Sequence, residues 1–411
     1  MGKKGRTIYS IINERFKLVM NDVYKIYTST FLMGIALAIS VISTVYQLAN
    51  GLSQTQIATI SSLFFISYAL LEIPTGGIAD TYGHKKSVVW GLVAHGISIL
   101  LIGILPDFRM FVISSLLAGL GYALQSGAYS SLIHDVLTNL NKSAYYIKVQ
   151  GRVSAYLLFG TLVASPVVSY LYQYSSQLPY ILSSVFLFLS AILVHSVKWK
   201  LRKDKPSLSL YFQSIKRGVQ ISLKNKRIIA LIILGVVLFL GGNLFANNIS
   251  QPLQLNLGIK IVQLGLVAAI ISGAKAMTSA YAYTLYQKFG GLNSLIGSII
   301  VTALIFFGLT QISGVFGIIL ILFLYIMAAY KDQIILTLLQ NEASNPERST
   351  IISTYSFLTF ILVGLTMPLG GLSIDYLGVS TTLLIIAAIT IMLGLFGLFI
   401  YSNNIKSSEG L

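Results

Sequence analysis

The chain has 411 residues, of which 55% are hydrophobic and 10% charged, and its mean hydropathy of +0.81 lies well above the range of soluble domains. This composition excludes a soluble protein and makes the lipid bilayer the solvent of the chain. The absence of cysteine excludes disulfides, thiolate metal sites and thiol catalysis.

Apolar stretches long enough to cross a bilayer as helices recur along the whole chain. A hydrocarbon core about 30 Å thick requires roughly 20 apolar residues for each helical span. We predict twelve spans, at residues 27–49, 56–79, 87–105, 109–133, 149–173, 178–197, 228–249, 261–286, 292–313, 315–339, 349–374 and 379–402. The expected fold class is therefore an all-α membrane protein with twelve transmembrane helices.

The net charge of +16 arises from basic residues that the predicted spans place mainly on one side of the membrane. Only Arg109 and Lys260 fall on the other side, while Lys275 and Lys331 lie within spans. By the positive-inside rule, this bias places both termini in the cytoplasm. Topology and contact with anionic membrane lipids explain the basic residues, so no nucleic-acid partner is expected.

One long polar segment interrupts the spans near the middle of the chain and predicts two six-helix halves. We expect an amphipathic cytoplasmic segment at 1–26, a bundle at 27–197, a basic cytoplasmic linker at 198–227, a second bundle at 228–402 and a tail at 403–411. "GRVSAYLLFGTLVASP" (151–166) aligns without gaps with "STYSFLTFILVGLTMP" (353–368). Such repeats are typical of secondary transporters. The alternative is a chance likeness of two apolar helices.

The stretch "EIPTGGIADTYGHKK" (72–86) ends the second span with an acid and a basic cluster. Its part "GGIADTYGHKK" resembles the loop between helices 2 and 3 of the major facilitator superfamily. The matching residues are Gly76, Asp80, Gly83, Lys85 and Lys86, whereas Thr81 and His84 stand where basic residues are usual. With the twelve spans and the duplication, this resemblance covers essentially the whole chain and implies the major facilitator fold.

The same resemblance implies that the loop is a conformational latch. Asp80, at a helix end, would pair with a basic residue or a helix N-terminus of the other half and hold the cytoplasmic side shut. Arg348, in "NPERSTIIS", is a candidate partner for the latch or for phosphate headgroups. The copy of the loop after the eighth span has Gln287 in place of the Asp. The alternative is an ordinary turn with solvated charges.

Charged residues within spans are candidates for function because their burial in a membrane costs several kcal/mol unless they are paired, hydrated or neutralised. Glu72 lies eight residues, or roughly 12 Å of helix rise, before Asp80. At that depth a carboxyl group favours its protonated form, which suits a proton carrier. A structural hydrogen bond from a protonated Glu72 is an equally open interpretation.

Two further groups of ionisable residues are candidates for proton coupling. In the eighth and tenth spans, Asp332 is expected to pair with Lys275 and to leave Lys331 to extend to the inner interface. This pair either orders the second half or is broken by substrate or proton. In the fourth span, His134 could titrate beside Asp135, or the two could form a solvated pair at the interface.

The expected substrate cavity is lined by aromatic and polar side chains that suit poorly hydrated organic ligands. Its candidate residues are Tyr122, Gln125, Tyr129, Arg152, Tyr156, Asn243, Ser279, Tyr325, Lys331 and Tyr355. "SGAYSSLIHDVL" resembles a stretch of bacterial efflux facilitators, although that subgroup often has acidic residues where Tyr129 and Ser130 stand here. Ser115 also replaces a basic residue that many proton-driven exporters carry.

These features favour a secondary active transporter that works by alternating access. The leading hypothesis is proton-coupled export of small amphipathic or lipophilic compounds. The alternatives are proton-coupled solute uptake and a flippase for lipids or anionic amphiphiles. Neither enzymatic motifs nor metal-ligand spacing are present, so no enzyme activity and no cofactor are expected. The resemblance further implies a monomer in a bacterial inner membrane.

Overall fold

The computed structural model describes residues 21–139, 142–198, 220, 222, 224–342 and 348–406, in which every regular element is a helix. The first half contains the span Asn21–Ala49, with η1 (Ala38–Ile42) and α2 (Ser43–Ala49), and then α3 (Gln54–Tyr82), α4 (His84–Ile104), α5 (Phe108–Gln125), α6 (Ala128–Thr138), η2 (Ser143–Tyr145), α7 (Tyr146–Tyr172) and α8 (Leu178–His195). The second half contains α10 (Lys226–Leu244), η3 (Phe245–Ile249), α11 (Ser250–Asn256), α12 (Ile261–Phe289), α13 (Gly291–Gly308), α14 (Gly314–Glu342) and α15 (Arg348–Lys406).

The predicted spans and the fold class are confirmed. Eleven helices of the described chain are long and apolar enough to cross a membrane, and α15 consists of two helices joined at Gly378. Three spans are irregular: the first contains the 3-10 turn η1, the fourth is broken at Ser126–Gly127, between α5 and α6, and the seventh contains the π-helical turn η3. Residues 1–20, 199–219 and 407–411 of the expected terminal segments and linker lie outside the described residues, so these domain boundaries stay predictions.

Glycine makes the sharp reversals between successive spans possible. Gly83 joins α3 to α4 with φ 99° and ψ 143°, and Gly378 joins the two parts of α15 with φ 80° and ψ 168°. A Cβ atom would strain the backbone in this region of φ and ψ, which is essentially restricted to glycine. The two reversals occur at opposite ends of the bundle.

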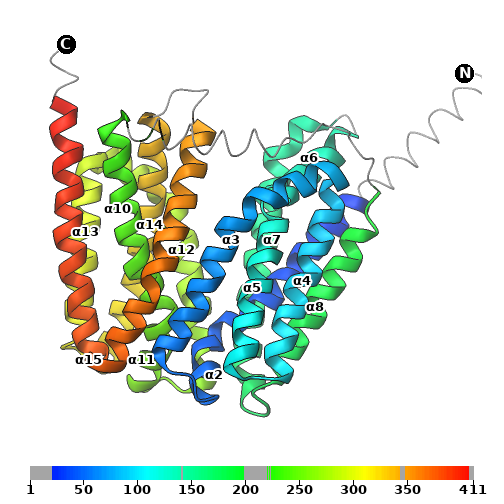
Figure 1. Ribbon diagram of the computed structural model, residues 1–411, viewed down its shortest axis with the longest axis horizontal. Helices are drawn as coiled ribbons and strands as arrows, with labels where there is room; N and C mark the ends of the chain where they lie inside the picture. The colour runs from blue at the N-terminus through cyan, green and yellow to red at the C-terminus, as the bar shows by residue number, and fades with distance from the viewer. Residues whose placement is uncertain are drawn as a thin grey trace, which may run out of the picture.

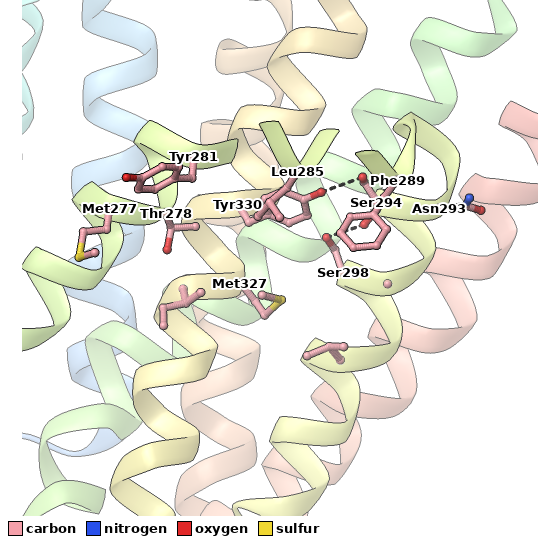
Figure 2. A pocket seen from close by; sticks show the side chains of 13 residues that line it. Met277, Thr278, Tyr281, Leu285, Phe289, Asn293, Ser294, Ser298, Met327 and Tyr330 are labelled. Atoms are coloured by element: carbon pink, nitrogen blue, oxygen red, sulfur yellow. Dashed lines mark hydrogen bonds between the residues drawn. The ribbon is translucent and has the colours of Figure 1, made fainter. Parts of the chain in front are cut away.

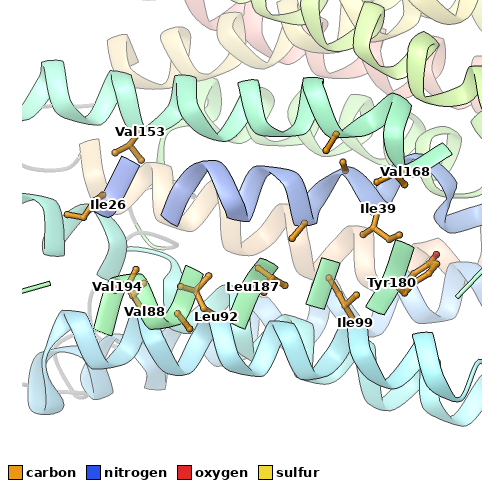
Figure 3. Close-up of a cluster of buried hydrophobic side chains, with 14 of the residues drawn as sticks. Ile26, Ile39, Val88, Leu92, Ile99, Val153, Val168, Tyr180, Leu187 and Val194 are labelled. Atoms are coloured by element: carbon orange, nitrogen blue, oxygen red, sulfur yellow. The ribbon is translucent and has the colours of Figure 1, made fainter. Parts of the chain in front are cut away.

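The spans form two bundles side by side, and each has its own hydrophobic core (Figure 1). In the first half, side chains from the first span, α4, α7 and α8 interdigitate, among them Ile39, Leu92, Val168 and Leu187 (Figure 3). The buried Tyr46 donates a hydrogen bond to the carbonyl oxygen of Ile102 at 2.8 Å, which satisfies its hydroxyl in the apolar interior. Each half is therefore a packed unit.

Hydrogen bonds between the halves are concentrated at one end of the molecule, here called the closed end. Gln251 accepts from the backbone N–H of Thr44 at 2.9 Å, and Asn248 donates to the carbonyl oxygen of Gln54 at 2.9 Å. The other end, here called the open end, carries Asn21 and Lys406, and the ribbons of the two halves diverge toward it (Figure 1). In the described chain, no hydrogen bond or ion pair between side chains of the two halves is found there.

Candidate functional site

An aromatic cluster lies where α3 of the first half meets α10 and α15 of the second half. Phe65 of α3 stacks on Phe360 of α15 with ring centroids 5.8 Å apart, and Tyr68 meets Phe360 at 5.2 Å. Phe239 of α10 completes the cluster, 5.9 Å from Phe360. We call these four residues the aromatic floor. The sequence analysis did not identify them.

Glu72 lies one helical turn beyond Tyr68, on the open side of the aromatic floor. Its Oε1 accepts a hydrogen bond from the hydroxyl of Ser126 at 3.0 Å, and the Tyr68 hydroxyl lies 3.4 Å from that of Ser126. Ser126 is part of the break between α5 and α6, where the chain leaves helical geometry. The break thus gives the carboxylate a polar partner within a membrane span, as a proton-carrying or a structural group requires.

The second half carries its charges at the same depth. Glu72 and Asp332 each follow the closed-end start of their helix, Gln54 or Gly314, by eighteen residues, which is roughly 27 Å of rise. Asp332 accepts a hydrogen bond from Lys331 at 3.1 Å, and the Lys331 ammonium lies 6.0 Å from the centre of the Phe239 ring. The charges of α14 therefore border the aromatic floor.

Lys331 and Asp332 line a cavity of about 220 Å³ inside the second half, which we call the lysine cavity. Its wall is formed by α10, η3, α12, α13 and α14. It brings together five residues predicted from the sequence, namely Asn243, Lys275, Tyr325, Lys331 and Asp332. Lys275 lies 5.9 Å from the centre of the Tyr325 ring, and the Tyr325 hydroxyl donates to Ser250 at 3.1 Å.

The expected pairing of these charges is wrong. Asp332 pairs with its neighbour Lys331 and not with Lys275, because adjacent side chains of α14 reach each other at 3.1 Å. Lys331 does not extend to the interface, since it is only 3% exposed. Lys275 is exposed on α12, and within the described residues it has no ion pair with a carboxylate.

The fourth span contributes a contact that the sequence did not predict. Asp135 is buried and lies 2.7 Å from Nδ1 of His84. The Nε2 atom of His84 lies 3.8 Å from the carboxylate of Asp80. His134 is exposed and lies 3.5 Å from the hydroxyl of Thr138. The His84 ring, a departure from the family pattern, therefore links the loop to α6.

Two further residues of the predicted latch form hydrogen bonds within their own half in this conformation. Lys85 donates to the carbonyl oxygens of His195 and Val197 at 3.0 and 3.1 Å, at the C-terminal end of α8. Arg348 similarly donates to the carbonyl oxygen of Gln340, 3.0 Å away, near the end of α14. Both contacts place a positive charge at the negative end of a helix.

In the part of the chain that the structure describes, no hydrogen bond or ion pair joins the principal loop residues of the predicted latch to the other half. Gly76 is exposed, and no atom lies within 4 Å of the position that its Cβ would occupy. Asp80 has half of its side chain exposed, and Lys86 is exposed as well. Gly83 supplies the turn between α3 and α4. Among the described residues, a closed latch at the open end is therefore not formed in this conformation.

A second loop makes such a contact at the closed end, and the sequence analysis missed it. Asp375 of α15 accepts from the backbone N–H groups of Gln54 and Thr55 at 3.0 and 2.8 Å, and from the Thr55 hydroxyl at 2.6 Å. This carboxylate therefore caps the N-terminus of α3 in the other half. Gly371 lets the helices approach, since its Cβ would lie 2.6 Å from the carbonyl oxygen of Gln54.

The signal that would have identified this contact is a repeated spacing. Gly371, Asp375 and Gly378 repeat the interval of Gly76, Asp80 and Gly83, with three residues between the first glycine and the Asp and two between the Asp and the second glycine. The final glycine has positive φ in both loops. The two loops are thus equivalent in sequence and backbone but lie at opposite ends.

Several residues predicted to line the substrate cavity lie within the first half. Tyr122 packs against His95, with ring centroids 4.8 Å apart. Gln125 is buried and donates to the carbonyl oxygen of Gly121 at 2.9 Å. The Tyr129 hydroxyl is hydrogen-bonded to that of Thr30 at 2.9 Å. None of the three predicted residues lines either of the two described cavities.

The other predicted cavity residues lie apart from the lysine cavity. Tyr156 stacks on Tyr27 at 5.1 Å, and the exposed Arg152 interacts with the same Tyr27. Ser279 is exposed on α12. Tyr355 is buried against Gly235, whose Cβ position lies 2.5 Å from the Tyr355 hydroxyl. These residues do not form one site in this conformation.

A larger cavity, of about 510 Å³, lies among α12, α13 and α14 toward the open end (Figure 2). Met277, Tyr281 and Phe289 of α12 and Met327 of α14 contribute to its mostly apolar lining. At one side the Tyr330 hydroxyl donates to Ser294 at 2.7 Å. The size and the flexible thioether and aromatic lining suit a lipophilic organic molecule.

Sequence comparisons relate the chain to known transporters. Residues 26–239, just over half of the chain, match the family model of the Major Facilitator Superfamily. The chain is 22% identical over 311 residues to the quinolone resistance protein NorA of Staphylococcus aureus strain MSSA476, an alignment that covers 74% of this chain and 76% of NorA. It is 23% identical over 184 residues to multidrug resistance protein 2 of Bacillus subtilis strain 168, over 44% of each.

Solved structures of low sequence identity share the fold. The nucleoside transporter NupG superposes with a TM-score of 0.78 at 14% identity, covering 93% of this chain and 99% of NupG. A bacterial homologue of the lysosomal transporter Spinster, in an inward-facing and unoccupied conformation, gives 0.74 at 12% identity over 95% and 98%. A D-xylose–proton symporter gives 0.69 at 16% identity over 92% and 97%.

Proposed function

The chain belongs to the Major Facilitator Superfamily, and from this membership we propose a secondary active transporter that exports small amphipathic or lipophilic compounds in exchange for protons. It is a multi-pass membrane protein and a transporter, not an enzyme. In the proposed mechanism of alternating access, the two halves open first one end and then the other around a site near the membrane midplane.

The arrangement of contacts supports this mechanism. The halves are joined at the closed end by Asp375, Gln251 and Asn248 and diverge toward the end that carries Asn21 and Lys406. The Spinster homologue, which has the same fold, is described as inward-facing. With both termini in the cytoplasm, as the positive-inside bias predicts, the open end faces the cytoplasm and receives substrate from that side.

The two equivalent loops support a latch at each end. Asp375 and Gly371 hold the closed end against the start of α3. Asp80 and Gly76 have the same spacing at the open end, where they have no partner in the other half within the described chain. When the open end closes, Asp80 would accept hydrogen bonds from the N-terminal turn of α15, as Asp375 does from the N-terminal turn of α3.

The single observation that carries proton coupling is the position of Glu72. Its carboxylate lies just above the aromatic floor, on the side of the opening, and accepts a hydrogen bond from Ser126. In the proposed mechanism, the carboxyl group exchanges a proton with the open end in this conformation. Closure of that end would then surround the group with protein, so that the proton travels with the conformational change.

The proposed substrates follow from the relatives and the apolar cavity. NorA and multidrug resistance protein 2 are named for resistance to quinolones and to many drugs. The cavity among α12, α13 and α14 has the size and lining that lipophilic molecules require. In the proposed mechanism, compounds that first partition into the inner membrane leaflet would enter this cavity.

Accumulation of a panel of fluorescent lipophilic dyes in cells without their main exporters tests the proposal. Expression of the wild type should lower dye accumulation, and both a protonophore and the substitution Glu72→Gln should abolish the effect. The control is Asp107→Asn, which makes the same change of carboxylate to amide at the exposed N-cap of α5 and preserves the cap. Unchanged export by Glu72→Gln at equal expression would refute the coupling role.

The same experiment decides against the alternative functions. Proton-coupled uptake predicts that expression raises intracellular dye and that the protonophore lowers it again. A dedicated flippase for lipids or anionic amphiphiles predicts no response to any neutral or cationic dye at comparable expression. Only a protonophore-sensitive fall in accumulation supports the proposed export.

A further inference from the structure

We propose that the lysine cavity binds an oxyanion, so that the transported compounds include molecules with a carboxylate, sulfonate or phosphate group. This inference rests on the proposed transport function, because it assigns a substrate class to a site beside the aromatic floor. It differs from the usual expectation for a lipophilic-drug exporter, in which a buried acid would select cations.

The charge of the cavity is the first observation. Its lining contains two ammonium groups, Lys275 and Lys331, and one carboxylate, Asp332. Asp332 already pairs with Lys331 at 3.1 Å, and no other acidic residue lines the cavity. One positive charge is therefore uncompensated at membrane depth. An anionic ligand would neutralise it, whereas a cation would be repelled.

The supply of hydrogen-bond donors is the second observation. The hydroxyl of Thr302 lines the cavity and is buried, with the residue 4% exposed, and it has no hydrogen-bond partner in the described part of the chain. Within the described residues, the Lys275 ammonium faces only the Tyr325 ring, 5.9 Å away. A ligand with oxygen acceptors would pair with the exposed Lys275 ammonium and satisfy the buried Thr302 hydroxyl, and a buried polar group without a partner is costly.

The size and surroundings of the cavity set the geometry of the ligand. A volume of about 220 Å³ holds an oxyanion with a short linker but not a drug-sized molecule. Phe239 belongs both to the cavity wall and to the aromatic floor, so the apolar remainder of a ligand would extend over the floor. The preferred ligand is thus an amphiphile with one anionic end.

Direct binding to the purified full chain tests the site. The probe is dansylglycine, an aromatic carboxylate, compared with its uncharged amide, and the protein is held in nanodiscs of phosphatidylcholine. A charge-assisted hydrogen bond predicts that the carboxylate binds about tenfold or more tightly than the amide. Lys275→Gln should remove about tenfold of the carboxylate affinity without changing that of the amide, whereas Lys275→Arg should retain most of it.

The matched control is Lys288→Gln, which removes an exposed lysine of the same helix outside both cavities. It should leave both affinities unchanged. Thr302→Val, which removes the unpartnered hydroxyl without removing a charge, should weaken carboxylate binding by a smaller factor. Equal binding of carboxylate and amide to the wild type, or equal effects of Lys275→Gln and Lys288→Gln, would overturn the proposal.

A second set of nanodiscs separates the two sources of an oxyanion. If a lipid phosphate occupies the cavity, added phosphatidylglycerol should weaken dansylglycine binding to the wild type but not the residual binding to Lys275→Gln. If the ligand is a free organic acid, phosphatidylglycerol should change both proteins equally. Because these are binding measurements, their failure leaves the export test of Glu72 unaffected, and failure of that test leaves the binding result standing.

Discussion

His84 shows how one side chain can adapt a family pattern. It stands where a basic residue is usual, and the structure places its ring between Asp135, at 2.7 Å, and Asp80, at 3.8 Å. The ring thus connects the turn after α3 to α6, while the side chain of Asp80 keeps half of its surface exposed for another partner. The sequence could not predict this contact, because 51 residues separate His84 from Asp135.

This network makes a prediction for stability at the residue scale. Asp135→Ala leaves the His84 ring without its buried acceptor and should lower the free energy of unfolding by about 1–3 kcal/mol. His134, the exposed neighbour of Asp135, provides the control. His134→Ala should change the free energy of unfolding by less than about 0.5 kcal/mol. Urea unfolding in mild detergent measures both. A larger loss for His134→Ala would restore the pairing expected from the sequence.

At the scale of elements, several close contacts between helices occur at glycines, which have no side chain. Gly34 in the first span packs directly against α7, since its Cβ position lies 2.1 Å from the carbonyl oxygen of Leu157. Gly160 of α7 is equally close to the backbone of Phe31. Without a hydrophobic driving force between helices in lipid, such close backbone packing is a main source of bundle stability.

A substitution at this contact should separate the two helices. Gly34→Ala requires the backbone of α7 to move and should cost about 1–3 kcal/mol of unfolding free energy. Gly273→Ala on α12 is the matched control, because no atom lies within 4 Å of its Cβ position. Alanine is the better helix former, so the control should be neutral or slightly stabilising. Thermal unfolding in detergent measures the stability of both variants. An equal loss of stability in Gly34→Ala and Gly273→Ala would contradict the packing argument.

The sequence predicted helices better than it predicted their partners. Span length and apolar composition located all twelve helices, because a membrane leaves the chain few other options. The break at Ser126–Gly127 has no strong local signal, although it provides the hydrogen bond to Glu72. The pairing of Lys331 with Asp332 depended on side-chain directions that helix periodicity alone does not fix.

At the scale of the whole molecule, the latch loops relate one end to the other. Asp375 caps the N-terminus of α3 at the closed end. Asp80 lies at the open end, and the intervals between it and its two neighbouring glycines are the same as those around Asp375. The loop of Asp80 was predicted from its resemblance to the family pattern, whereas the loop of Asp375, on the other side of the membrane, was not. The all-α membrane class followed from composition and span length, and the major facilitator fold from these together with the duplication and the resemblance of the loop that contains Asp80.

Alternating opening is tested most directly by distances at both ends in one protein. Because the chain has no cysteine, pairs of introduced cysteines can carry spin labels without a background. Asn139→Cys with Asn341→Cys reports on the open end, and Ser175→Cys with Gln311→Cys on the closed end, where all four positions are exposed. Double electron–electron resonance is recorded for each pair with and without Asp375→Asn, and with Asp107→Asn as the control.

Loss of the Asp375 charge weakens the cap on α3 and should shift the equilibrium up to about fivefold toward the opposite conformation. The account predicts that the open-end pair gains a shorter distance while the closed-end pair gains a longer one, and that Asp107→Asn changes neither. Distances that move in the same direction at both ends, or a closed end that loosens while the open end stays fixed, would contradict it.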